Sequence, residues 1–401
     1  MTARAIISAR HCRVTGVVQG VGFRPFVHRL AHRHGLTGWV RNDAGEVRLF
    51  VEGTEPGLTR FFQDLVREAP PLARIDLVNT AAARPEGRKR FEVLASTEVD
   101  RERRLPLPAD VVMCAACLAE LQDPANRRYH YPFITCTDCG PRFTVIHELP
   151  YERSRTSMAA FAQCRRCERE FRTPEDRRFH SETNSCPECG PALWLEIPSK
   201  AVEDGRRWSK AVETDGQAGR RDYEAVLHDA ARRLRNGEIL AIRGLGGFHL
   251  AVDATSQDAV ERLRARKRRE AKPLAVMVRS VEEAEQLAIV GPEEQRALLA
   301  RERPVVLLPS RPGAVAHSVH PGLHLIGIML AYTPLHYRLL ELAGRPLVMT
   351  SGNLSEEPIA AGLDEARQRL GGIADAFLMH DREIITRCDD SVVRPVGPDL
   401  I

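Results

Sequence analysis

The chain has 401 residues, 43% of them hydrophobic and 28% charged, which is long enough for several folded domains and excludes disorder of the whole chain. Its 58 Lys and Arg residues against 54 Asp and Glu residues give a net charge of +4, which is too small to imply nucleic-acid binding by bulk attraction, so we do not expect double-stranded nucleic acid as a partner. We find no sequence typical of a signal peptide or a membrane-spanning helix, so we expect a cytoplasmic protein with no membrane partner.

Residues 5–97 are predicted to form the first domain. The NDAG turn between its middle strands supplies the residues that a tight hairpin needs. The order β-α-β-β-α-β predicts a ferredoxin-like sandwich. In chain order, the predicted elements are a strand over 10–18, a helix over 25–34, the strands TGWVRN and EVRLFVEG, a helix over 58–68, and late strands near 75–79 and 91–94.

The turn between the first strand and the first helix is rich in glycine. Backbone N–H groups at the start of a helix are unpaired and lie at the positive end of the helix dipole, so such a turn binds anions. Glycines let this backbone curl around a tetrahedral anion, and an arginine in the first helical turn can donate to two phosphate oxygens. We therefore predict a phosphoryl-binding site formed by Gln19, Gly20, Val21, Gly22, Phe23 and Arg24.

The string GVVQGVGFRPFVHRLA, followed by GLTGWVRNDAGEV, resembles the acylphosphatase family over most of the first predicted domain. The resemblance implies that Arg24 is the catalytic phosphate-binding arginine and that Asn42 orients the attacking water. Charge that collects on the phosphoryl oxygens would be met by Arg24 and the loop amides, without a nucleophile from the protein.

Residues 108–197 carry two copies of one repeat, because RRYHYPFITCTDCGP begins at Arg127 and RRFHSETNSCPECGP at Arg177. Each copy has the spacing C-x2-C-x18-C-x2-C, and four thiolates form a closed zinc site of the structural kind. The spacing leaves open whether each copy forms its own site or the pairs interleave. We predict two zinc ions, bound by Cys114, Cys117, Cys136, Cys139, Cys164, Cys167, Cys186 and Cys189.

Two histidines of the repeats and two cysteines outside the repeats are not expected to bind metal. His130 and His180 recur at equivalent positions and are expected to pack rather than to bind metal. Cys12 and Cys388 lie outside the pattern and are expected to be ordinary thiols.

Nucleic-acid contact is a competing role for the repeats, because arginines cluster in them. Acidic residues interleaved with these arginines weaken that interpretation.

A third domain of the α/β class is predicted over residues 223–401, with a twisted mixed sheet. Residues 198–222, which precede it, are charged, have few apolar anchors and are predicted to be a linker or an insertion. The predicted elements are a helix over 223–235, the strand ILAIRG, a helix over 257–268, the strand LAVMV, a further helix, the strand PVVLLP, the helix TPLHYRLLELAG and the strand PLVMTS.

Two polar segments of this domain are predicted to frame a nucleotide pocket. Their sequences, RKRREAKPLAVM and TSGNLSEEPI, resemble the YrdC family, which forms carbamoyl-type adenylates from ATP. Magnesium is expected on the ATP phosphates because of their charge. The resemblance implies that ATP and carbamate are bound by Lys267, Arg269, Lys272, Ser351 and Asn353.

Taken together, the three segments predict an α+β multidomain enzyme and resemble the carbamoyltransferase family of nickel-iron hydrogenase maturation. The resemblance implies that carbamoyl phosphate is hydrolysed in the first domain and that the carbamate reacts with ATP to give carbamoyl-adenylate, for delivery to the partner HypE as the precursor of a cyanide ligand. Members of that family normally continue into a further C-terminal domain, so we expect transfer to HypE to need that domain or another chain. The residues leave open two alternatives, threonylcarbamoyl-type transfer in tRNA modification and a non-catalytic zinc scaffold.

Overall fold

The computed structural model describes residues 6–43, 45–97, 107–199, 208–213, 222–354, 357–396 and 399–400. Several expectations fall outside these ranges: the domain ends at 5 and 401, Ala44 of the predicted hairpin, and residues 200–207 and 214–221 of the predicted linker. The chain divides into two compact units, one made of residues 1–110 and 135–184 and the other of residues 111–134 and 185–401.

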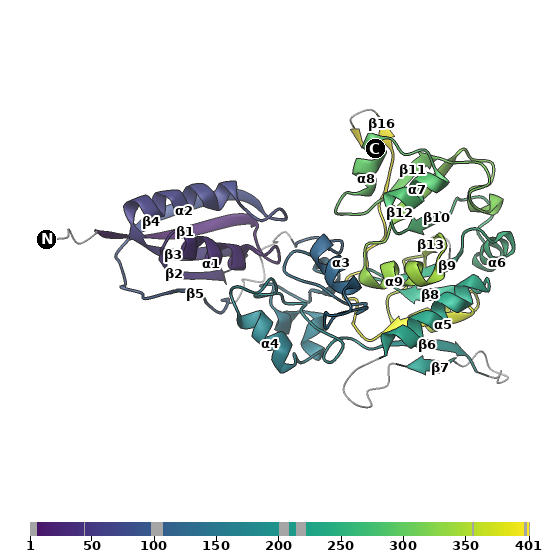
Figure 1. The fold of residues 1–401 in the computed structure, drawn as a ribbon, viewed down its shortest axis with the longest axis horizontal. Coiled ribbons are helices and arrows are strands. Elements are labelled where there is room, and N and C mark those ends of the chain that lie inside the picture. Colours follow the sequence, from purple (N-terminus) through teal and green to yellow (C-terminus); the bar gives the residue numbers. More distant parts are fainter. Residues whose placement is uncertain are drawn as a thin grey trace. The chain divides into compact units, whose positions relative to one another are not determined.

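The first unit contains a five-stranded sheet with the strand order β4-β1-β3-β2-β5 (Figure 1). Its strands pair antiparallel, except that β5 is parallel to β2. This arrangement confirms the ferredoxin-like fold expected from the sequence. The elements are β1 (Ile7–Val17), α1 (Phe23–Arg33), β2 (Thr37–Asp43), β3 (Glu46–Thr54), α2 (Glu55–Arg67), β4 (Arg74–Ala83) and β5 (Phe91–Val93).

Both helices of this sandwich pack on one face of the sheet, where alternate residues of the strands are apolar. Val14 of β1 and Leu49 of β3 are fully buried there, together with Leu30 of α1 and Phe61 of α2. On the opposite face Trp39 stacks on the ring of Phe50, with the ring centroids 6.4 Å apart. The packed face fixes the position of α1 on the sheet, and therefore the position of the glycine-rich turn that precedes it.

The two cysteine repeats contain little regular structure, as their weak apolar periodicity predicts. The second unit holds α3 (Ala115–Gln122). The first unit holds α4 (Arg165–Arg172) and three turns of 3-10 helix, η1 (Phe143–Val145), η2 (Arg153–Arg155) and η3 (Ser157–Ala160). With so little helix or sheet, these segments depend on side-chain hydrogen bonds and metal ligands for their shape.

The second unit is built on a ten-stranded mixed sheet with the order β15-β11-β12-β10-β13-β9-β8-β14-β6-β7 (Figure 1). The sheet contains both parallel pairs, such as β10 with β12 and β8 with β14, and antiparallel ones, which confirms the expected mixed sheet. The strands of the sheet are β6 (Leu193–Pro198), β7 (Trp208–Glu213), β8 (Leu240–Arg243), β9 (Phe248–Asp253), β10 (Ala275–Val278), β11 (Val305–Pro309), β12 (Leu325–Leu330), β13 (Leu347–Ser351), β14 (Ala376–His380) and β15 (Val392–Val393).

Helices connect these strands, and their apolar faces complete the core of the second unit. The helical elements are α5 (Tyr223–Arg235), α6 (Gln257–Lys267), α7 (Val281–Leu287), α8 (Pro292–Leu298), η4 (His317–Val319), α9 (Pro334–Ala343) and α10 (Leu363–Leu370). A short antiparallel pair, β16 (Pro395–Val396) and β17 (Asp399–Leu400), follows near the end of the chain.

Part of the predicted linker is a strand. Residues 208–213 form β7, which pairs antiparallel with β6 at the edge of the sheet. The anchor is Trp208, whose ring packs edge-on against Phe377 of β14 with the centroids 4.4 Å apart. A single large aromatic residue therefore fixes a segment whose composition is otherwise typical of a loop.

None of the helices in the part of the chain that the structure describes combines the length and the apolar character that are needed to cross a membrane.

Candidate functional site

The glycine-rich turn of the first unit has the conformation that an anion site needs. Gly20 and Gly22 have φ angles of +69° and +74°, and Gly22 caps α1 in the left-handed region. Among the described residues, the backbone N–H groups of Gly20, Val21 and Gly22 have no hydrogen-bond acceptor. The turn therefore presents free donors beside the positive end of α1, as an anion-binding turn does.

Arg24, in the first turn of α1, is buried beside this loop, and its guanidinium contacts the second repeat. Its side chain is 9% exposed, and its Nη2 donates to Oε1 of Glu182 at 2.9 Å and to the carbonyl oxygen of Tyr151 at 3.3 Å. Its Nη1 lies 3.9 Å from Oε1 of Glu152. The guanidinium is thus held in place in the structure by a carboxylate and a carbonyl from residues 151–182.

The loop itself is fixed from both sides. Gln19 donates from Nε2 to the carbonyl oxygen of Glu46 at 3.3 Å, and its Oε1 accepts from the backbone N–H of Tyr151 at 3.4 Å. Arg142 of the first repeat donates from Nε to the carbonyl oxygen of Gly20 at 2.6 Å. Because these contacts come from side chains that are themselves buried, the loop conformation is determined before any ligand binds.

A small pocket lies over the loop within the first unit. It is lined by Gly20, Gly22 and Arg24 on one side and by Thr137, Arg142 and Glu182 on the other. A larger cavity of about 580 Å³ lies beside it and shares Arg24, His180 and Glu182 in its lining. The candidate phosphoryl site is therefore enclosed by residues of both cysteine repeats.

Asn42 lies on β2, where it pairs with Val47 of β3. Its side chain is 1% exposed, and within the described part of the chain neither its Oδ1 nor its Nδ2 has a hydrogen-bond partner. A buried amide without partners is costly, since its desolvation is not compensated. This side chain is therefore available to bind a water molecule or a substrate group, although it is not among the residues that line the small pocket.

Burial controls the protonation of the groups around Arg24. Desolvation raises the pKa of the Glu182 carboxyl to about 7, although the Arg24 guanidinium and the backbone N–H of Arg153 both lower it. Burial also raises the pKa of Tyr151 to about 12, so its hydroxyl stays protonated. Desolvation and the Arg24 charge lower the pKa of His180 to about 3, which leaves a neutral ring beside the guanidinium. The positive charge beside the loop therefore comes from two arginines, Arg24 and Arg142, and not from the histidine.

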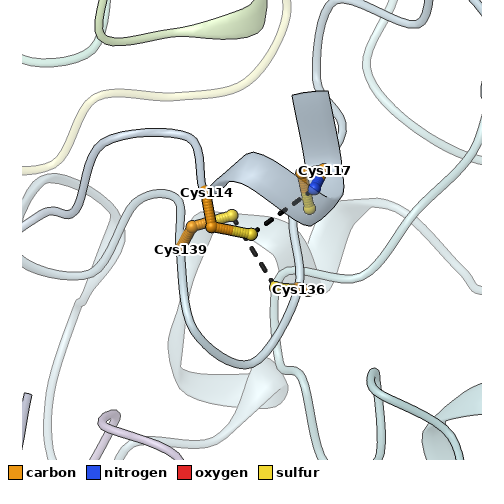
Figure 2. A group of neighbouring side chains, drawn as sticks. All are labelled: Cys114, Cys117, Cys136 and Cys139. Atoms are coloured by element: carbon orange, nitrogen blue, oxygen red, sulfur yellow. Dashed lines mark hydrogen bonds between the residues drawn. The ribbon is translucent and has the colours of Figure 1, made fainter. Parts of the chain in front are cut away.

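The eight paired cysteines form two groups of four, one for each repeat. Cys114, Cys117, Cys136 and Cys139 make the first group, which is drawn in Figure 2, and in each group the ligand atoms all lie within 4.8 Å of one another. This arrangement answers the question that spacing left open, because each copy forms its own group. The second group is Cys164, Cys167, Cys186 and Cys189.

The distances within both groups fit zinc. Sulfur atoms at about 2.3 Å from a tetrahedral zinc ion are about 3.8 Å apart, and the pairs Cys136–Cys139 and Cys186–Cys189 both have Sγ atoms 3.8 Å apart. A backbone N–H donates to a sulfur in the first group, from Cys117 to Sγ of Cys114 at 3.4 Å (Figure 2). Such N–H donors stabilise thiolates, which is the form that binds the metal.

The ring of each repeat histidine packs against an aromatic neighbour, as expected, and each histidine also has a backbone role that the sequence did not indicate. His130 and His180 both have left-handed φ angles, of +57° and +52°. The N–H of His130 donates to the carbonyl oxygen of Leu121, and that of His180 donates to Phe171. The equivalent conformation in the two copies shows that each histidine ends a turn, while the metal groups consist of cysteine alone.

In the second unit, four of the five predicted nucleotide-binding residues lie together. Lys267 at the end of α6 donates from Nζ to the carbonyl oxygens of Ser351 and Asn353, each at 2.6 Å, and to Oδ1 of Asn353 at 2.9 Å. Arg269 is 3.4 Å from Oγ1 of Thr350 through Nη1. The side chain of Lys272 is exposed, and its carbonyl oxygen accepts from Nε of Arg269.

The cations of this group are partly buried, which alters their charge. Desolvation, together with the neighbouring charges of Arg269 and Lys272, lowers the pKa of Lys267 to about 7, although the carboxylate of Asp389 raises it. Lys267 is therefore charged in only part of the molecules at neutral pH. A polyphosphate placed beside it would favour the charged form.

Several residues around the phosphate loop were missed from the sequence. Glu182 and Arg142 contact the loop or its arginine, and both depart from the repeat, since the equivalent positions in the other copy are Pro132 and Ala192. A comparison of the two copies could therefore have identified both residues, because each is polar at a position where the other copy has Pro or Ala. Tyr151 contributes backbone atoms, which no residue type reveals.

Comparison with family models divides the chain into three segments. Residues 10–93 match the acylphosphatase family, residues 113–146 and 164–196 match the family described as the HypF finger, and residues 232–401 match the Sua5/YciO/YrdC family described as telomere recombination. These matches confirm the identity expected for each of the three segments.

Longer relatives match almost the whole chain. It is 51% identical to carbamoyltransferase HypF2 of Cupriavidus necator, over 96% of this chain and 48% of the relative. It is 48% identical to carbamoyltransferase HypF of Rhodobacter capsulatus, over 98% of this chain and 50% of the relative. A crystal structure of full-length HypF in the phosphate- and nucleotide-bound form is 41% identical, with a TM-score of 0.89 over 98% of this chain and 49% of that one. The chain thus spans about half the length of these relatives.

Proposed function

Because the chain belongs to the HypF family, we propose that it hydrolyses carbamoyl phosphate in its acylphosphatase segment and activates the carbamate with ATP in its YrdC-like segment. The observation that carries the first step is the combination of free loop amides at Gly20–Gly22 with the buried guanidinium of Arg24. The carbamoyl group would then pass to a HypE-type partner as the precursor of a cyanide ligand.

In the first step, water attacks the substrate and the products are carbamate and inorganic phosphate. Arg24 and the loop amides would bind the phosphoryl oxygens and stabilise the negative charge that increases on them in the transition state. Asn42, whose amide atoms are buried without partners, would hold the attacking water in line. No side chain needs to form a covalent intermediate.

In the second step, a carbamate oxygen attacks the α-phosphorus of ATP, and the products are carbamoyl-adenylate and pyrophosphate. Lys267, Arg269, Ser351 and Asn353 would contact the nucleotide and the carbamate, with Lys272 at the exposed edge. Magnesium would neutralise the ATP phosphates as they bind. The two zinc ions would have a structural role, since all eight ligands are protein sulfurs and no position remains for water. Cysteines that bind a metal as thiolates, rather than forming disulfides, fit a reducing compartment, the cytoplasm.

Two assays on the purified chain test these steps. Phosphate release from carbamoyl phosphate should fall by about 10²–10³ in kcat for Arg24→Ala, the loss typical of a removed transition-state donor. Arg172→Ala, an exposed arginine of the same unit, is the matched control and should keep full activity. Unchanged release in Arg24→Ala would contradict the proposal.

Exchange of labelled pyrophosphate into ATP tests the second step. We expect exchange that depends on carbamoyl phosphate and disappears in Arg24→Ala, because the carbamate comes from the first site. Exchange that requires threonine instead would favour the tRNA-modification alternative. A chain with neither activity, but with both zinc ions bound, would favour the scaffold.

A further inference from the structure

Both donor hydrogens on Nη2 of Arg24 are already occupied in the structure. Its Nη2 contacts two acceptors, Oε1 of Glu182 at 2.9 Å and the carbonyl oxygen of Tyr151 at 3.3 Å. One NH2 group has two hydrogens, so both hydrogens of Nη2 are used. The resting guanidinium therefore has no free hydrogen on this nitrogen.

This nitrogen is the one that a phosphoryl group needs. A guanidinium offers two edges for two-point binding, Nη1 with Nη2 and Nε with Nη2, and Nη2 belongs to both. A phosphoryl group can bind Arg24 through two parallel hydrogen bonds only if one of the present acceptors leaves Nη2. The structure thus shows Arg24 in a state that must change when the ligand binds in this way.

Glu182 is the acceptor that is expected to leave. Burial favours the protonated form of its carboxyl, but the ion pair with Arg24 at 2.9 Å favours the ionised form. A second anion held against the same nitrogen in a buried pocket would repel this carboxylate strongly. The Tyr151 acceptor is a neutral backbone carbonyl without this conflict. Glu182 also has a second donor, the backbone N–H of Arg153, which is 2.9 Å from its Oε2. When the carboxylate turns away from Arg24, this second hydrogen bond is also loosened.

The surrounding space allows this movement. Arg24, Glu182 and His180 line both the small pocket over the loop and the neighbouring cavity of about 580 Å³. The ion pair thus lies at the boundary between the two spaces, and the carboxylate can turn toward the larger one. The His180 ring, which lines both spaces, is neutral, because burial lowers its pKa to about 3.

We infer that Glu182, from the second cysteine repeat, is an internal anion that occupies Arg24 until a phosphoryl group displaces it. The carboxylate competes with the ligand and so sets the affinity of the site for phosphoryl groups. It also keeps the guanidinium directed toward the loop while the site is empty. This inference rests on the proposed function, in which Arg24 binds the phosphoryl group.

The test is calorimetric titration of inorganic phosphate into the wild type and Glu182→Gln. The glutamine keeps the size of the side chain and removes its charge. Because a charge-assisted hydrogen bond is roughly twice as strong as a neutral one, we expect phosphate to bind about tenfold tighter in Glu182→Gln. Glu168→Gln, the same change at an exposed carboxylate of the same repeat, should bind phosphate like the wild type. Affinity that is equal to or weaker than that of the wild type in Glu182→Gln, with two zinc ions still bound, would overturn the inference.

A second measurement needs no variant of Glu182. Saturating phosphate should speed amide hydrogen exchange at Arg153 in the wild type, because the carboxylate that accepts from this N–H moves. Slower or unchanged exchange at Arg153 would also overturn the inference. Arg24→Ala separates the two hypotheses, because phosphate binding that survives this change contradicts the proposed function itself. Loss of binding in Arg24→Ala without tightening in Glu182→Gln contradicts only the role of Glu182.

Discussion

Arg142 offers the sharpest test of how the first cysteine repeat supports the phosphate loop. The residue is 2% exposed, and its guanidinium donates to four backbone carbonyl oxygens. One belongs to Gly20 of the loop at 2.6 Å, and the other three, at 2.9 to 3.0 Å, belong to Thr137, Cys139 and Pro141. We expect Arg142→Met to leave all four acceptors buried without a donor.

The magnitude follows from these contacts. A hydrogen bond from a charged donor contributes about 1.5–3 kcal/mol, but four bonds to one group are not additive. Removal of one partner from a buried charged network costs about 3–5 kcal/mol in the free energy of unfolding. We therefore expect this range for Arg142→Met, and a smaller loss for Arg142→Lys, because an ammonium has three donors and no planar fork.

Urea unfolding of the zinc-loaded protein measures the loss, and phosphate release from carbamoyl phosphate measures the effect on the loop. Arg172→Met is the control, since Arg172 is 74% exposed and its ion pair with Glu168 contributes at most about 0.5 kcal/mol. The KM for carbamoyl phosphate should rise in Arg142→Met under conditions where the variant is folded. A loss below about 1 kcal/mol would refute the reasoning that this arginine holds the loop.

Three further predictions concern the loop, the zinc and the nucleotide. Gly22→Ala should weaken phosphate binding, because a left-handed φ costs about 1–2 kcal/mol for alanine and the new Cβ would lie 2.9 Å from Cγ2 of Thr137. Gly35→Ala is the control. Gly35 has a similar φ but open space where the Cβ would lie, so this variant should bind phosphate like the wild type. Cys136→Ser should release one of the two zinc ions, as measured by metal analysis, and loss of both or neither would contradict independent sites. ATP binding should take up a proton near neutral pH and weaken as the pH rises above about 7, because Lys267 loses its charge there. Calorimetry in two buffers measures this proton uptake, which should vanish in Lys267→Arg. Uptake that persists in the variant would contradict the role of Lys267.

The lowered pKa of Lys267 also makes the free energy of unfolding depend on pH. Its pKa in the folded protein is about 7, below the ordinary lysine value of 10.5, so the unfolded chain binds more protons between these two values. The free energy of unfolding should therefore rise as the pH increases through this window and fall as the pH drops toward 7.

Local sequence patterns predicted most of the fold and the central part of the site. The strand, glycine turn and helix around Arg24 are adjacent in the chain, so residue types and spacing were enough to predict them. The cysteine pairs were recognised for the same reason, but spacing left open which pairs share a zinc ion. Only the folded chain decided that question, since it depends on how segments about 20 residues apart meet.

The partners of Arg24 could not be predicted from these patterns. Glu182 lies 158 residues away along the chain, and its role follows from a buried contact that hydrophobic periodicity does not encode. The strand β7 was also missed, because one aromatic ring, that of Trp208, supplies the packing that its charged neighbours lack. In both cases a tertiary contact outweighed the local composition.

The two repeats exchange arginines in a reciprocal way. Arg128 of the first copy donates from Nε to the carbonyl oxygen of Ser185 in the second, at 2.9 Å. Arg178, its equivalent in the second copy, donates in the same manner to Thr135 in the first, at 3.0 Å. The same donor position in each copy therefore binds the same acceptor position in the other copy. This is the pattern of a self-complementary interface between identical subunits. Neither copy is therefore a module that can be excised or grafted alone, and protein engineering on this scaffold has to transplant the duplicated pair as one piece.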